Sequence, residues 1–175
     1  MPLAKMIGPK ITSMCPNVGW EVGPGFNQKN VLSITLNGSL ENMPYAQKIV
    51  AQAPRIPEWD VGVGRQPKKW NGQLELFNSR NRPVLMDASK WRYALTGFQN
   101  HAFFDIAIFA CWPPLAHALK LRAARTGILN LLGEVVMLER FDRIEVVESP
   151  SKADSTRSSE FMDLKNHLEY LASQR

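Results

Sequence analysis

Three residues of the chain, Asp105, Cys111 and His101, are of types that can share a nucleophilic active site. In such a site a cysteine thiolate is the nucleophile and a histidine serves as its base. Cys111, however, ends a strongly apolar stretch, and a thiol in such surroundings is normally an inert small hydrophobe. The sequence therefore favours a structural thiol. A small hydrolase or transferase with a pocket near these three residues is the alternative interpretation.

The sequence lacks the residue spacings that metal sites and nucleotide-binding sites need. None of the three histidines, His101, His117 and His167, has a second ligand three or four residues away, and zinc requires three or four converging ligands. Gly62 and Gly64 begin a G-x-G pattern, but no third glycine follows, and Gln66-Pro67 would break the helix that phosphate binding requires. We therefore predict no catalytic, metal or cofactor-binding residue.

Exposed aromatic and basic residues form the candidate interaction surface, because aromatic anchors dominate the energetics of protein interfaces. Core packing is the better explanation for Trp59 and Trp112. The residues assigned to the surface are Trp20, Lys68, Lys69, Trp70 and Trp91.

The composition is that of a folded domain with mild positive charge. Of 175 residues, 45% are hydrophobic and 21% charged, and the formal net charge is +5. The basic residues are scattered, so nucleic acid is a less favoured partner than protein. The two cysteines lack metal-like spacing, and no window has the length and hydrophobicity of a membrane span, so we expect a cytoplasmic protein that does not enter membranes.

The chain centres on Asn30–Gly64, which predicts a strand, a helix and a second strand. Val31–Leu36 is short, apolar and β-branched, and it ends at a turn. A helix begins at about Pro44, where a missing N–H is harmless, and Trp59–Val63 alternates as a strand does.

The remaining apolar segments predict a similar second half. Ala102–Cys111 reads as a central buried strand, followed by a helix over Leu115–Leu132 that Gly133 ends and by a strand over Phe141–Glu148. Shorter strands are predicted at Val18–Val22, Gln73–Phe77, Val84–Met86 and Trp91–Leu95, with a one-turn helix at Asp87–Lys90.

These elements predict an α+β fold: a mostly antiparallel sheet with helices on one face, in a ferredoxin-like arrangement of two βαβ-like halves. A single domain is expected over 1–148, followed by a flexible tether over 149–159. Residues 160–175 then form an amphipathic helix whose apolar stripe must dock on the domain.

Several short pieces of the sequence recur, in order, in a bacterial family of uncharacterised proteins that the chain resembles over roughly residues 15–148. They are Trp20-Glu21-Val22-Gly23-Pro24, Ile34-Thr35-Leu36-Asn37-Gly38, Val50-Ala51-Gln52-Ala53-Pro54, Ile56-Pro57-Glu58-Trp59, Leu132-Gly133-Glu134 and Arg143-Ile144-Glu145-Val146. The resemblance implies an α+β sheet domain and no particular activity. The chain departs from the family in its short N-terminal region.

The favoured interpretation is a non-enzymatic protein-interaction module, such as an inhibitor, an adaptor or an immunity-type protein. Its functional residues are expected in the loops at Gln66–Gly72 and Phe98–His101 or on the terminal helix. Binding of RNA on an open sheet face is a further alternative, and it predicts exposed aromatics flanked by lysines.

Overall fold

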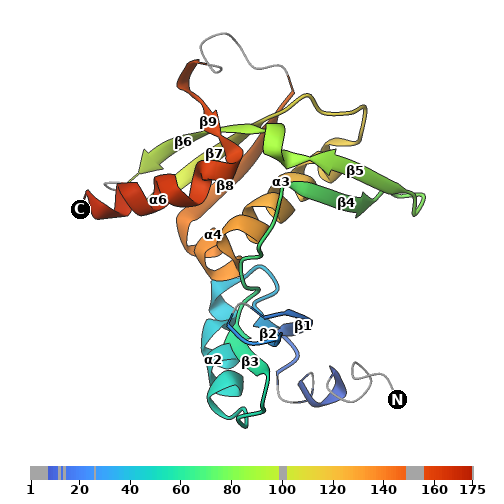
Figure 1. Cartoon of the computed structure of the whole chain (residues 1–175), viewed down its shortest axis with the longest axis vertical. Helices are drawn as coiled ribbons and strands as arrows, with labels where there is room; N and C mark the ends of the chain where they lie inside the picture. Colours follow the sequence, from blue (N-terminus) through green and yellow to red (C-terminus); the bar gives the residue numbers. More distant parts are fainter. Residues whose placement is uncertain are drawn as a thin grey trace. The chain divides into compact units, whose positions relative to one another are not determined.

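The computed structural model describes residues 8–11, 13, 15–25, 27–98, 102–148 and 156–174. The chain divides into two compact units, residues 1–68 with 132–139 and residues 69–131 with 140–175. Both units contain helices and strands, which confirms the predicted α+β class (Figure 1). This division does not test the single domain expected over 1–148, which stays a prediction.

The first unit is built on a three-stranded sheet in the order β1-β2-β3. Strand β1 (Gly19–Pro24) runs antiparallel to β2 (Asn30–Thr35), and β2 runs parallel to β3 (Trp59–Val63). The 3-10 turn η1 (Leu40–Asn42) and helix α2 (Met43–Ala51) make the crossover between the parallel strands. The strand, helix and strand predicted over Asn30–Gly64 are therefore confirmed.

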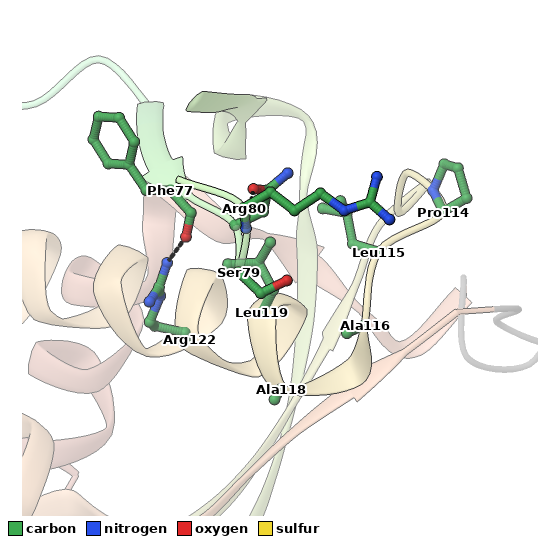
Figure 2. Close-up of a pocket in the computed structure, with 10 residues that line it drawn as sticks. Phe77, Ser79, Arg80, Pro114, Leu115, Ala116, Ala118, Leu119 and Arg122 are labelled. Atoms are coloured by element: carbon green, nitrogen blue, oxygen red, sulfur yellow. Dashed lines mark hydrogen bonds between the residues drawn. The ribbon is translucent and has the colours of Figure 1, made fainter. Parts of the chain in front are cut away.

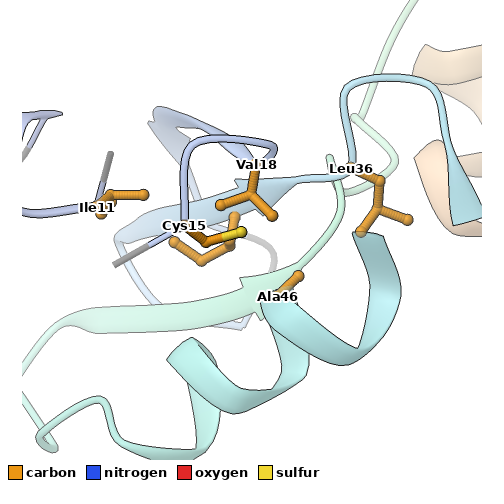
Figure 3. Close-up of a cluster of buried hydrophobic side chains, with 6 residues drawn as sticks. Ile11, Cys15, Val18, Leu36 and Ala46 are labelled. Atoms are coloured by element: carbon orange, nitrogen blue, oxygen red, sulfur yellow. The ribbon is translucent and has the colours of Figure 1, made fainter. Parts of the chain in front are cut away.

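The core of this unit lies between β2 and α2. Ile34 from the central strand, Leu36 directly after it and Ala46 from the helix have no exposed surface, and Ile11, Cys15 and Val18 pack with them (Figure 3). Pro44 stands in the first turn of α2, where its missing N–H leaves no intrahelical acceptor unsatisfied.

Most of helix α4 (Glu134–Arg140) belongs to the first unit, and its first residue, Glu134, has a buried side-chain carboxylate. Glu134 is only 3% exposed, and its side chain accepts hydrogen bonds from the backbone N–H groups of Gly38, at 3.4 Å, and Arg65, at 3.1 Å. Its own backbone N–H donates to the Arg65 carbonyl oxygen at 2.8 Å. One residue thus ties together the segments that follow β2 and β3.

Gly133 is required at the junction before Glu134 for two reasons. Its φ of +82° lies in the left-handed region, and a Cβ there would lie 2.9 Å from the Arg65 carbonyl oxygen. The glycine predicted to end the long helix does end it. The short helix α4 was not predicted.

The second unit is built on a four-stranded sheet in the order β8-β7-β6-β9. Strand β6 (Arg92–Phe98) is antiparallel to β7 (Phe103–Phe109), and β7 is parallel to β8 (Phe141–Val147). Phe104, Ile106 and Ile108 of β7 are at most 1% exposed, as the prediction of a central buried strand requires. A separate hairpin pairs β4 (Gln73–Phe77) with β5 (Pro83–Asp87), and the 3-10 turn η2 (Ala88–Lys90) follows it.

Aromatic contacts join the long helix and the C-terminal segment of the second unit. Trp91 packs against Trp112 and Phe161 at ring-centroid distances of 4.8 and 5.5 Å. A Cβ at Gly127 of helix α3 (His117–Leu132) would lie 3.0 Å from the Phe161 ring. Gly127 has a low helix propensity, but its lack of a side chain permits the Phe161 ring to pack closely on the helix.

The C-terminal segment belongs to this unit. Of the predicted tether, residues 149–155 lie outside the described residues, whereas β9 (Ser159–Glu160) pairs with β6. The 3-10 turn η3 (Phe161–Asp163) and helix α6 (Leu164–Ser173) follow, and Figure 1 shows α6 alongside the sheet. Leu164 and Leu168 of the predicted stripe are buried.

The ferredoxin-like arrangement is not confirmed. The described strands form three separate sheets, and both parallel pairs, β2 with β3 and β7 with β8, lie at sheet edges. The two βαβ-like halves exist, but each has its own sheet. Pattern and propensity set the strands themselves, whereas the pairing of distant strands depends on packing that local patterns do not encode.

Replacing Glu134 with alanine should destabilise the first unit by about 3 kcal/mol, because two part-buried backbone N–H groups lose a charged acceptor. Urea unfolding measures the loss, and amide hydrogen exchange should show faster exchange at Gly38 and Arg65. Glu139→Ala, at an exposed position of the same helix, is the matched control and should change little. Equal stability of the two variants would contradict this role of Glu134.

Candidate functional site

Of the three residues of the predicted enzyme site, the structure describes Asp105 and Cys111, which lie at different places on β7 and beyond it. Asp105 lies in the middle of β7 and forms an ion pair with Arg143 at 2.9 Å. A rise of about 3.3 Å per residue places Phe109, the last residue of that strand, about 13 Å from Asp105, and Cys111 lies two residues beyond it. His101 lies outside the described residues. Among the described residues, no group of His, Cys, Asp and Glu could hold a metal ion.

The interpretation of Cys111 as a core thiol is wrong, because its side chain is exposed. The apolar strand ends at Phe109, so the residues after it turn away from the core. Cys111 lines a small cavity of about 280 Å³ together with Trp91, Trp112 and the ion-paired Asp87 and Lys90. The hydroxyl of Ser89, hydrogen-bonded to Asp87, lowers the pKa of that carboxyl. Cys15 is the buried thiol of the chain.

The five residues of the predicted interaction surface divide between the two units, with Trp20 and Lys68 in the first and Lys69, Trp70 and Trp91 in the second. In the first unit, Trp20 packs against the core and Lys68 lies 4.0 Å from Glu21. In the second unit, Lys69 is exposed and Trp70 is partly buried, with its indole N–H donating to the Gln73 carbonyl oxygen.

Trp91 is only 5% exposed and cannot serve as a surface anchor. It was assigned to the surface as an aromatic anchor, but its ring packs against Trp112 and Phe161.

A cavity of the second unit lies where the β4–β5 turn meets the start of α3 (Figure 2). Asn78 shapes the turn: its side-chain oxygen accepts hydrogen bonds from the backbone N–H groups of Arg80 and Arg82, at 2.9 and 3.0 Å. Asn81 completes the turn with a φ of +53°, a conformation that asparagine adopts more readily than most residues. Arg80 is therefore held at the tip of a defined turn.

Helix α3 supplies the other wall. Pro113 and Pro114 lead into it, and the Ala116 carbonyl oxygen accepts the first helical hydrogen bonds, from Leu119 and Lys120. The guanidinium group of Arg122 donates to the Phe77 carbonyl oxygen and thereby ties the helix to the hairpin (Figure 2). No acidic residue stands in the first turn of α3, so the positive end of the helix dipole is not neutralised locally.

The cavity has a volume of about 620 Å³, within the range of binding pockets for small ligands and side chains. Its apolar lining consists of Phe77, Pro114, Leu115, Ala116, Ala118 and Leu119. The charged residues of the lining are Arg80 and Arg122, and no acidic residue accompanies them. In Figure 2 the Arg80 side chain extends from the turn towards Leu115. The cavity can therefore hold an apolar group joined to an anion.

Sequence reasoning missed this cavity, although its parts were visible. The two strands that flank the turn and the helix over Leu115–Leu132 were both predicted, yet they are far apart in the sequence. The signal that could have found it is the pair of arginines, one in the turn and one in the second turn of the helix, but nothing in the sequence indicates that they approach each other.

A polar pair lies apart from this cavity, between the sheet and α6. The Tyr93 hydroxyl and the His167 Nδ1 atom are 2.7 Å apart, and Tyr93 is 1% exposed. Burial raises the pKa of Tyr93 to about 12. A buried phenol whose hydroxyl has a partner is a structural element here, because neither residue lines the cavities that contain Arg80 or Cys111.

Comparison with known proteins adds no relative: no family model, curated protein or solved structure matches the chain. Over the described residues, no helix combines the length and the hydropathy that crossing a bilayer demands.

The raised pKa of Tyr93 predicts a loss of stability in strong alkali. The folded state holds the phenol proton more tightly than the unfolded chain, whose tyrosine pKa is near 10, so this contribution is complete below pH 10 and disappears as the pH rises to about 12. Ultraviolet absorbance of tyrosinate should show a late step near pH 12 that Tyr93→Phe removes. A titration curve that is identical in shape without Tyr93 would contradict the assignment.

Proposed function

We propose that the chain is a non-enzymatic protein-interaction module that holds an apolar, acidic segment of a partner protein in the cavity between the β4–β5 turn and the start of α3. The observation behind the proposal is the composition of the lining: apolar side chains, two arginines and no carboxylate. An inhibitor, an adaptor or an immunity-type protein would each use such a site.

Charge complementarity selects the chemistry of the partner. A carboxylate placed near Arg80 gains a charge-assisted hydrogen bond, and the N-terminal end of α3 adds a favourable dipole. Arg122 already donates to the Phe77 carbonyl oxygen, so its guanidinium group is held in position without a ligand. A basic segment would meet two like charges and is disfavoured.

The surroundings of the cavity favour a protein segment. Phe77 is 49% exposed and Leu85, on the same face of the hairpin, is 74% exposed, so apolar surface continues beyond the cavity. Exposed apolar surface rimmed by polar residues is typical of protein interaction sites. An extended segment could also pair with an edge of this two-stranded hairpin.

The two alternative functions, an enzyme and an RNA-binding protein, are less well supported. An enzyme site needs Asp105 and Cys111 in one cleft, but Asp105 lies in the middle of β7, ion-paired with Arg143, whereas Cys111 lies beyond the end of that strand, in the lining of another cavity. For RNA, Phe98 and Phe103 do form an exposed pair on the four-stranded sheet, at 46% and 43%, but in the next rows of that face Arg143 is ion-paired with Asp105 and Glu145, and no lysine is present. A cytoplasmic location and membership of the uncharacterised bacterial family are parts of the same proposal.

Fluorescence anisotropy with short synthetic peptides tests the function. A peptide that alternates leucine or phenylalanine with glutamate should bind, and the same peptide with lysine in place of glutamate should not. Arg80→Glu should weaken binding of the acidic peptide at least tenfold, a change of about 1.4 kcal/mol.

Arg125→Glu is the matched control, since Arg125 is an exposed residue of α3 that does not line the cavity. Equal weakening by both reversals would indicate general charge attraction and contradict a defined site. Equal binding of the acidic and basic peptides would contradict the proposed partner chemistry.

A further inference from the structure

Strand β8 forms one edge of the four-stranded sheet. It pairs with β7 on one side, and in the described part of the chain no strand pairs with its other side. Such an edge presents backbone N–H and C=O groups that a further strand can use. At seven residues, β8 is long enough to pair with a complete strand.

The sequence of this edge is complementary to itself in one antiparallel register. With Ile144 opposite Ile144, Arg143 of each strand lies opposite Glu145 of the other, and this pairing occurs twice. Directly opposed residues on one face of an antiparallel pair interact strongly, and opposite charges there are favourable.

The neighbouring registers are unfavourable. A shift that keeps the same side chains on each face centres the pairing on Arg143 or on Glu145. The first places two arginines opposite each other and the second places two glutamates opposite each other, and like charges in such positions are destabilising. The charge order therefore selects a single register.

The side chains that would make these contacts are available. Arg143 and Glu145 are 63% and 47% exposed in their side chains, and both lie on the face of the sheet that also carries Asp105. Within one chain, Arg143 is 2.9 Å from Asp105 and 3.1 Å from Glu145, so its guanidinium group is already oriented among carboxylates at this edge. A second Glu145 would extend the existing ion-pair network.

We infer that the edge of β8 binds a second copy of the chain, with the two β8 strands antiparallel about Ile144 and the two sheets joined into one. The interface is isologous, because each copy contributes the same strand, and it closes as a dimer. The inference does not depend on the cavity beside α3, because it rests on different residues.

A charge-swap experiment tests it on the full chain by sedimentation velocity over a concentration series. The wild-type chain should dimerise. Glu145→Arg alone and Arg143→Glu alone should both be monomeric, because each places like charges opposite each other twice. An equimolar mixture of the two variants should dimerise again. In the mixture one chain has arginine at positions 143 and 145, and the other has glutamate at both. Each opposed pair between the two chains then has opposite charges.

Circular dichroism and thermal unfolding establish that each variant is folded. Glu169→Arg, a reversal at an exposed position of α6, is the matched control and should leave dimerisation unchanged. A monomeric wild-type chain at all concentrations, a dimer that persists in the single variants, or a folded mixture that stays monomeric would each overturn the inference.

Discussion

The buried carboxylate of Glu134 is the interaction on which the first unit most depends. Burial of a charge is costly unless hydrogen bonds replace its hydration, and here the replacement comes from the backbone N–H groups of Gly38 and Arg65. These two residues follow the two parallel strands β2 and β3. The carboxylate therefore joins the strand ends to α4, and the junction in turn requires a left-handed glycine at position 133.

Local features of this chain were predictable because short-range physics determines them. Strand β3 begins and ends at the predicted residues, Trp59 and Val63, because apolar side chains alternate over this segment and a turn follows it. The one-turn helix predicted at Asp87–Lys90 is η2, and Asp87 caps it, with its carboxylate accepting from the Ser89 backbone N–H. Each of these outcomes depends on residues within a few positions of one another.

What could not be predicted depends on contacts between distant segments. Glu134 resembles any surface glutamate in the sequence, because its two N–H partners lie 69 and 96 residues away. Trp91 is buried because Phe161, from the far end of the chain, packs on it. The cavity beside α3 likewise exists only because a hairpin turn and a distant helix start lie together.

The two proposed binding surfaces use charge in different ways. At the cavity, Arg80 and Arg122 lack acidic neighbours in the lining, so the charge remains for a partner. At the edge of β8, the charges already alternate in sign, so the strand is suited to a copy of itself. The net charge of the whole sequence therefore does not distinguish the basic cavity from the edge of β8, where positive and negative charges balance.

The central claim is that a partner protein occupies the cavity between the β4–β5 turn and α3. The most direct measurement is quantitative affinity purification from the source cell with the wild-type chain and with Ala118→Trp, which fills the cavity from the exposed first turn of α3. If the cavity is the binding site, the wild-type chain should retain one or a few proteins that the folded Ala118→Trp variant does not. Each of these proteins should have an acidic, apolar segment. Equal recovery of the same proteins by both chains would contradict it.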